Sequence, residues 1–204
     1  MQTTYHSKYF AFHIILYLNL YSIDLPSLSS IDIQGCSFND IREFVIDDLA
    51  NLESVKIGEN CFTISDDEGN DGICQITNCP NLRQLEIGNH CFGYFKSFEL
   101  SNLNSIQSIY FGNNCFKNVR EFVIDDLANL EIVKIGEECF RISDDERNDG
   151  ICQITNCPNL RQLEIGDDCL IIIESINISN LNSIQSIKFG RKCFEYADFS
   201  LKGE

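Results

Sequence analysis

An eleven-residue pattern returns along almost the whole chain, and no other feature constrains the fold as strongly. Its form is apolar-x-x-apolar-x-apolar-Gly-x-x-Cys-Phe, and the first copy is the weakest. The copies occupy residues 28–38, 52–62, 82–92, 106–116, 130–140, 160–170 and 184–194. A pattern that returns with a regular period indicates a stack of similar structural units.

The spacing of the motif glycines indicates a longer repeat. These glycines are Gly58, Gly88, Gly112, Gly136, Gly166 and Gly190. They lie 30, 24, 24, 30 and 24 residues apart, so three units make a 78-residue super-repeat, which spans residues 44–121 and returns at 122–199. Residues 44–92 and 122–170 differ at only 7 of 49 positions, and almost all of these differences fall where the pattern predicts solvent. The two copies therefore keep the residues that one shared interior would require.

Each unit contains the patterns of two short strands. Alternation such as that at residues 85–87 (Leu-Glu-Ile) has the period of a strand with one buried face, and a second alternating segment, such as residues 44–46 (Phe-Val-Ile), precedes it. The glycine that follows suits a turn with a positive φ. Units stacked about 4.8 Å apart would form parallel sheets around a continuous interior. For residues 24–204 we therefore predict a mainly β solenoid of about seven stacked β-coils, with few or no long helices.

The eleven cysteines fit the same interior. Four of them replace core phenylalanine or leucine residues of neighbouring units, and Cys36 is one residue out of step. The other six come directly before the last apolar residue of the motif: Cys61, Cys91, Cys115, Cys139, Cys169 and Cys193. The spacing fits no zinc site, so we predict no metal, no cofactor and mostly reduced thiols that behave as small buried hydrophobes. Reduced thiols favour a cytoplasmic location.

Two rows of polar residues follow from this register. The outward row is a candidate partner-binding surface, although its neighbouring opposite charges predict pairing within the row. It consists of Asp32, Lys56, Glu86, Tyr110, Lys134, Glu164 and Lys188. The second row lies in the turn before each motif, where short polar side chains are expected to accept backbone N–H bonds. It consists of Asp24, Asp48, Asn78, Asn102, Asp126, Asn156 and Asn180.

The two 30-residue units carry acidic insertions at residues 65–72 and 143–150. Candidate partner-binding residues there are Asp66, Asp67, Asp144 and Asp145. A calcium site is the alternative, but the residue order does not match an EF-hand loop and no flanking helices are predicted. We expect a solvated acidic loop, or a docking surface for a basic protein partner.

The formal net charge of −16 argues against several classes of partner. A surface this acidic repels nucleic acid. The apolar run at residues 9–21 is too short for a membrane span. The three histidines form no metal-binding pair, and the chain shows no nucleophile motif and no glycine-rich phosphate loop. We therefore predict that the protein is not an enzyme, has no catalytic residues and takes no small-molecule substrate.

These residues resemble the leucine-rich repeat superfamily, and most closely its BspA-like subclass, whose units carry an Ile-Gly-x-x-Ala-Phe segment. The resemblance covers about residues 24–194, with cysteine in place of the alanine. It implies a curved leucine-rich-repeat solenoid used for protein binding or adhesion, without a common active site. The expected function is a non-enzymatic protein-interaction scaffold whose protein partner is not identified.

Two further expectations remain open. Residues 1–23 are either an N-terminal leader or a degenerate capping coil. A leader, together with the glycosylation sequon at Asn177, would favour a surface or secreted adhesion protein. The chain also stops early in a new coil, so a fragment of a longer repeat array is the other alternative.

Overall fold

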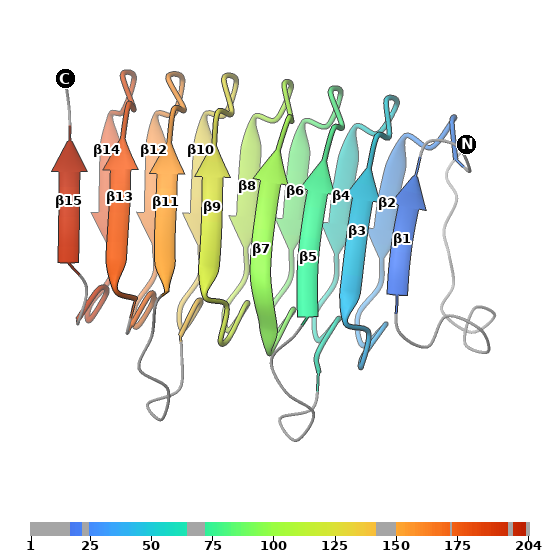
Figure 1. Ribbon diagram of the computed structural model, residues 1–204, viewed down its shortest axis with the longest axis horizontal. Helices are drawn as coiled ribbons and strands as arrows, with labels where there is room; N and C mark the ends of the chain where they lie inside the picture. The colour runs from blue at the N-terminus through green and yellow to red at the C-terminus, as the bar shows by residue number, and fades with distance from the viewer. Residues whose placement is uncertain are drawn as a thin grey trace.

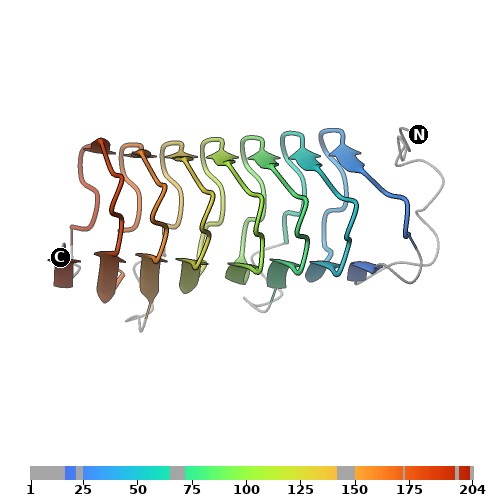
Figure 2. The ribbon, with the colours of Figure 1, turned by 90° about the horizontal axis from the view of Figure 1, so that it is seen from above.

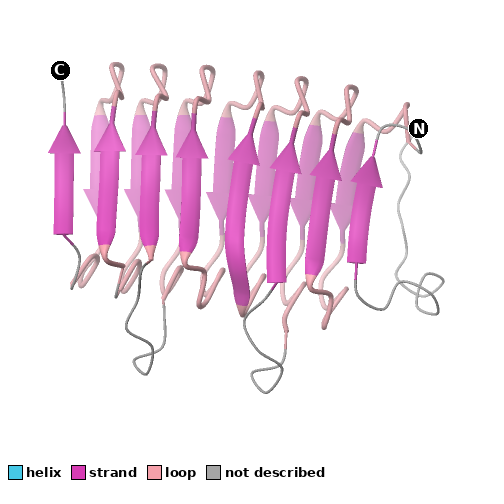
Figure 3. Cartoon of the chain, viewed as in Figure 1, coloured by secondary structure: helices cyan, strands magenta, loops and turns pink. Residues whose placement is uncertain are grey.

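The computed structural model describes residues 17–21, 25–64, 72–141, 150–171, 173–195 and 198–202. Within these residues all regular elements are strands (Figure 3). The odd-numbered strands are β1 (Tyr17–Tyr21), β3 (Glu43–Asp47), β5 (Gly72–Thr77), β7 (Phe95–Ser101), β9 (Glu121–Asp125), β11 (Ile151–Thr155), β13 (Ser175–Ser179) and β15 (Asp198–Lys202). The even-numbered strands are β2 (Ser30–Ile33), β4 (Ser54–Ile57), β6 (Gln84–Ile87), β8 (Ser108–Phe111), β10 (Ile132–Ile135), β12 (Gln162–Ile165) and β14 (Ser186–Phe189).

Two parallel sheets face each other, and the chain crosses from one to the other after every strand (Figures 1 and 2). The odd-numbered strands form an eight-stranded sheet from β1 to β15, and the even-numbered strands form a seven-stranded sheet from β2 to β14. We call these the odd sheet and the even sheet, and we call an odd strand with the even strand that follows it a unit. The prediction of a mainly β chain with parallel sheets is confirmed.

Alternating apolar residues fill the space between the sheets. In β3, Phe44 and Ile46 are fully buried. Phe44 pairs in register with Cys74 of β5, and Phe122 pairs with Cys152 at the same place in the second super-repeat. The two near-identical segments therefore adopt the same pairing. At the N-terminal end, β1 pairs in parallel with β3, so the odd sheet begins within residues 1–23.

The motif phenylalanines form a continuous stack along the interior. The rings of Phe62 and Phe92 lie 4.8 Å apart and 3° from parallel. Phe116 follows at 5.0 Å from Phe92, and Phe140 follows at 5.2 Å from Phe116. Stacked pairs of this kind add roughly 0.5–1.5 kcal/mol beyond their burial. Leu170, which replaces phenylalanine in the second copy, is also fully buried.

The motif glycines allow neighbouring units to approach closely, and the prediction that they adopt a positive φ is wrong. None of them has a φ in the left-handed region. An added Cβ at Gly88 would come within 2.8 Å of the Gly58 carbonyl carbon, and one at Gly136 within 2.6 Å of the Gly112 carbonyl carbon. Any side chain at these positions would push the units apart.

The left-handed conformation falls on other residues: within the motif, on the second residue after the glycine and on the final phenylalanine or leucine, and outside the motif, on the turn row. Its described members have φ values of 52–57°: Asp48, Asn78, Asn102, Asp126, Asn156 and Asn180. Asn and Asp adopt this conformation more readily than other residues with a side chain. The amides of this row also bond from unit to unit, since Asn102 Nδ2 donates to Asn78 Oδ1 at 2.9 Å and Asn180 Nδ2 donates to Asn156 Oδ1 at 2.7 Å. These oxygens accept from side-chain amides rather than from the predicted backbone N–H groups, and Asp24 lies outside the described residues.

Candidate functional site

The predicted outward row lies on the outer face of the even sheet. Each member pairs in register with the next, from Asp32 on β2 to Lys188 on β14. We call this surface the ladder face, and it consists of Asp32, Lys56, Glu86, Tyr110, Lys134, Glu164 and Lys188. The structure thus brings together all predicted members of this row.

Ion pairs connect neighbouring strands along the ladder face. Lys56 Nζ lies 3.6 Å from Glu86 Oε2, and Lys134 Nζ lies 3.2 Å from Glu164 Oε2. Lys188 Nζ contacts the other oxygen of Glu164 at 2.5 Å. The hydrogen bond from Lys188, supported by Lys134, lowers the pKa of Glu164 to about 2. The lysines of this face are therefore largely occupied by carboxylates of the same face, which leaves it close to neutral.

The other predicted partner-binding residues belong to the acidic insertions. Asp66 and Asp67 lie in the first insertion, and Asp144 and Asp145 lie in the second. All four lie outside the described residues. Their role as a docking surface therefore stays a prediction.

The outer face of the odd sheet carries the negative charge that the ladder face lacks, and the sequence reasoning missed it. We call it the carboxylate face, after five residues of β3, β7 and β9: Glu43, Asp47, Glu99, Glu121 and Asp125. Lys96, at the start of β7, is the single basic residue at the remaining outward positions of the described strands from β3 to β13, and the others are Ser, Thr, Asn, Gln, Ile and Val. The alternation in the first strand of each unit contained this signal, because the positions between its buried residues are rich in acids.

Neutral donors hold these carboxylates in place. Thr77 Oγ1 and Asn78 Nδ2 both donate to Asp47 Oδ1 at 2.7 Å. Gln75 Nε2 donates to Glu99 Oε2 at 2.8 Å. Hydroxyl and amide donors orient a carboxylate without neutralising it. The carboxylate face therefore keeps its negative charge.

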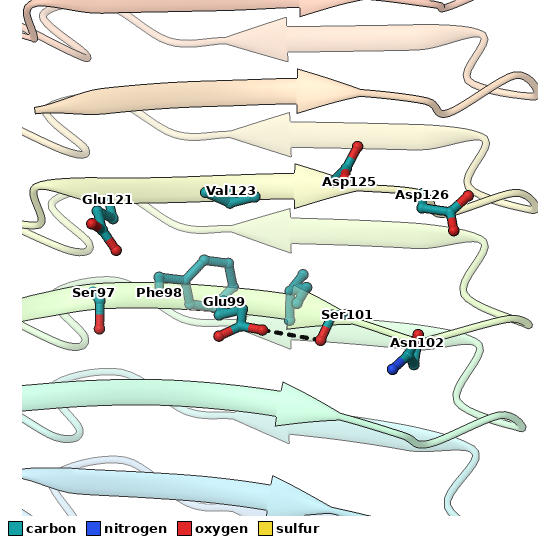
Figure 4. A pocket seen from close by; sticks show the side chains of 10 residues that line it. Ser97, Phe98, Glu99, Ser101, Asn102, Glu121, Val123, Asp125 and Asp126 are labelled. Atoms are coloured by element: carbon teal, nitrogen blue, oxygen red, sulfur yellow. Dashed lines mark hydrogen bonds between the residues drawn. The ribbon is translucent and has the colours of Figure 1, made fainter.

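A depression of about 400 Å³ lies on the carboxylate face between β7 and β9 (Figure 4). Ser97 and Ser101 line one side with small side chains, and Glu121 and Asp125 line the other. Glu99 lies between Ser97 and Ser101 on β7, and it accepts a hydrogen bond from Ser101 Oγ at 3.1 Å. Carboxylates in such a depression can accept charge-assisted hydrogen bonds from a lysine or arginine. The depression lies where the first super-repeat meets the second.

Most of the cysteine thiols are buried between the two sheets rather than exposed on either outer face. All eleven cysteines are unbridged, and only Cys36 is exposed. Cys115 Sγ donates to Gly88 O at 3.0 Å, and Cys139 Sγ donates to Gly112 O at 3.1 Å. The same bond recurs in other units, and an alanine could not supply it. These thiols therefore have a structural use, in which each unit satisfies a carbonyl of the unit before it.

Some classes of site are absent from the part of the chain that the structure describes. It holds no group of three or more His, Cys, Asp or Glu side chains arranged for a metal ion. It contains no helix long and apolar enough to cross a membrane. Comparisons with models of protein families, with curated proteins and with solved structures each find no match to the chain. The resemblance to leucine-rich repeats therefore depends on the repeat motif alone.

Proposed function

We propose that this protein is a non-enzymatic interaction scaffold, built as a leucine-rich-repeat-like solenoid of the BspA-like type. In this proposal the carboxylate face binds a basic protein partner. The regular alternation between two parallel sheets supports the solenoid, as does the close stacking of the motif glycines. Stacked repeats offer extended, rigid surfaces, which suits them to binding other proteins.

The contrast between the two outer faces is the observation that carries the proposal. On the ladder face, acids and lysines alternate and form ion pairs, such as that between Lys134 and Glu164. On the carboxylate face, acids such as Asp47 and Glu99 are bonded by uncharged groups. A basic partner would therefore gain charge pairing on the carboxylate face, whereas on the ladder face it would have to displace existing pairs.

Two matched variants test the choice of face. The first removes three charges from the carboxylate face with Glu99→Gln, Glu121→Gln and Asp125→Asn. The control removes three charges from the ladder face with Asp32→Asn, Glu86→Gln and Glu164→Gln. Proteins captured from an extract of the source cells at low salt would be quantified for wild type and both variants.

We expect the carboxylate-face variant to lose partners that the wild type and the control retain. Capture by the wild type should weaken as salt is raised. Equal capture by all three proteins, or loss only in the ladder-face control, would contradict the proposed binding face.

One observation favours the secreted alternative. Asn177, the acceptor of the glycosylation sequon, is exposed on the outer face of β13. The eleven unbridged cysteines favour an intracellular location instead, because exported proteins form disulfides. A mass measurement of the protein from its source cells would distinguish them: an added glycan or a removed leader supports export, and an unmodified N-terminus with free thiols supports the intracellular proposal.

A further inference from the structure

The ladder face is neutral, although the chain carries a formal net charge of −16. Its members are three acids, three lysines and Tyr110, which lies on β8, the middle strand of the even sheet (Figure 1). Two copies of so acidic a chain repel each other overall, and a neutral face weakens that repulsion where they meet. The order of the charges then decides whether two copies of this face attract each other.

The charges of the ladder face are complementary about Tyr110. At each distance from Tyr110, the residue on one side carries the charge opposite to that of the residue on the other side. At one, two and three strands from β8, the matched pairs are Glu86 and Lys134, Lys56 and Glu164, and Asp32 and Lys188. The pattern is read outward from β8, so further units at either end would leave these pairs unchanged.

The 78-residue repeat does not by itself produce this pattern. Along the ladder face, lysine and glutamate recur exactly, but the third position of the repeat holds three different residues: Asp32, Tyr110 and Lys188. An exact repeat would place the same residue at the centre and at both flanking positions. The departure from the repeat instead gives a neutral residue at the centre and opposite charges at equal distances from it, as complementarity of the face to itself requires.

This charge order selects one symmetry for contact between two ladder faces. A two-fold axis parallel to β8, beside Tyr110, reverses the order of the strands in the second copy and keeps their direction. Glu86 then lies opposite Lys134 of the second copy, and Tyr110 lies opposite its own counterpart. A two-fold axis along the stack would place each charge opposite itself, which is unfavourable.

Contacts of this kind do not displace the ion pairs within each copy. Lys134 Nζ lies 3.2 Å from Glu164 Oε2 of its own chain, and it would gain a second carboxylate from Glu86 of the other copy. Charges would therefore alternate both along each face and across the interface. An uncharged residue suits the axis, because a charged residue there would meet its own copy.

A second row of residues, each directly before an even strand, is complementary about the same strand. It consists of Ser29, Glu53, Arg83, Gln107, Glu131, Arg161 and Gln185. Gln107, which is uncharged, precedes β8. The same axis places Glu53 opposite Arg161 of the second copy and Arg83 opposite Glu131. Two neighbouring rows thus agree on one axis.

We propose that the ladder face binds a second copy of this chain, face to face, about a two-fold axis that runs along β8 beside Tyr110. Seven strands of four residues give a face of roughly 29 Å by 13 Å, which is small for a permanent dimer. We therefore expect reversible association with a Kd of about 10–100 μM. The dimer leaves the carboxylate face free, since that face lies on the other sheet.

Two single charge reversals test the proposal by sedimentation equilibrium of the whole chain in reducing buffer. Glu86→Lys places two lysines opposite each other at each of two symmetric contacts, and Lys134→Glu places two glutamates there. We expect each variant alone to associate about tenfold more weakly than the wild type, or worse. For Glu86→Lys this loss would occur although the variant is less acidic overall.

A mixture of the two variants provides the matched control. Opposite charges face each other again at both contacts, so we expect the mixture to form a dimer about as strongly as the wild type. Urea unfolding checks that both variants are folded. A wild type that stays monomeric up to about 1 mM would overturn the proposal. Single variants that associate like the wild type, or a mixture that stays monomeric, would overturn it as well.

Substitutions at Tyr110 test the position of the axis. Tyr110→Phe keeps the centre uncharged and should dimerise like the wild type, whereas Tyr110→Lys places two lysines on the axis and should weaken the dimer about tenfold. Equal dimerisation of these two variants would contradict the axis. The variant with Glu99→Gln, Glu121→Gln and Asp125→Asn should dimerise no more weakly than the wild type, so dimerisation and partner binding at the carboxylate face can fail separately.

Discussion

At the scale of single residues, the motif glycine and cysteine act together across neighbouring units. The glycine lets two backbones approach, and the cysteine of the following unit donates its thiol proton to the glycine carbonyl, as Cys139 does to Gly112 O. Buried backbones stacked at this spacing need two things: room to approach each other, and a hydrogen-bond donor for each buried carbonyl. The motif therefore repeats the pair rather than either residue alone.

Replacement of a motif glycine by alanine should be costly. The Gly136→Ala variant would place a Cβ 2.6 Å from the Gly112 carbonyl carbon, so we expect a loss of about 1–3 kcal/mol in the free energy of unfolding. Gly93→Ala is the matched control, because the nearest atom to its added Cβ is Thr63 Cγ2 at 3.4 Å. That variant should change stability by no more than about 0.5 kcal/mol. Urea unfolding checks both, and equal losses would contradict the close-approach explanation.

The buried thiols predict loss of stability at alkaline pH. Burial raises the pKa of Cys152 to about 12, and burial is the main cause that raises the pKa of Cys79 and Cys157 to about 11. Because the unfolded chain loses these protons first, the native state holds more of them above about pH 8.5. Stability should be constant with respect to these groups below that pH and fall as the pH rises toward 11–12. Unfolding from pH 7 to 11 measures the slope, and the Cys152→Ala variant should show a smaller one.

At the scale of elements, the junction between β7 and β9 differs from the other junctions of the odd sheet. Register pairing there stops at Leu100 and Ile124. In the turn row, Asn78 N donates to Ser101 O at 3.2 Å and Asp126 N donates to Thr155 O at 3.3 Å. The structure shows no equivalent bond from Asn102 N within the described turns. The depression of the carboxylate face lies at this interruption.

The interrupted turn row predicts faster local opening. The backbone amide of Asn102 should exchange its hydrogen faster than the equivalent amides of Asn78 and Asp126, because only the latter two are bonded to the next unit. Amide exchange followed by NMR at neutral pH measures all three in one experiment. Equal protection of the three amides would show that the junction is as closed as its neighbours.

At the scale of the whole molecule, the sequence predicted the arrangement well where it depends on repetition. The register of the ladder face follows from equivalent motif positions, and Lys56 and Glu86 pair as expected. The prediction of a positive φ at the motif glycines was wrong. Glycine is selected both by a positive φ and by a close approach of two backbones, so the sequence alone does not distinguish the two causes. The depression beside Glu99 could not be predicted, because it depends on where the pairing of two strands stops, which no single unit encodes.

The central claim is that the units stack in one continuous, repetitive column, and deletion of one super-repeat tests it most directly. Removal of residues 44–121 joins Glu43 to Phe122, which restores the natural step from Glu121 to Phe122. Removal of residues 44–122 is the control, because a shift of one residue exchanges buried and exposed positions. Small-angle X-ray scattering and urea unfolding would compare both variants with the whole chain. We predict that the first variant folds cooperatively and is shorter by roughly 14 Å, three units, while the control does not fold. An unfolded first variant, or equal behaviour of the two, would contradict the account.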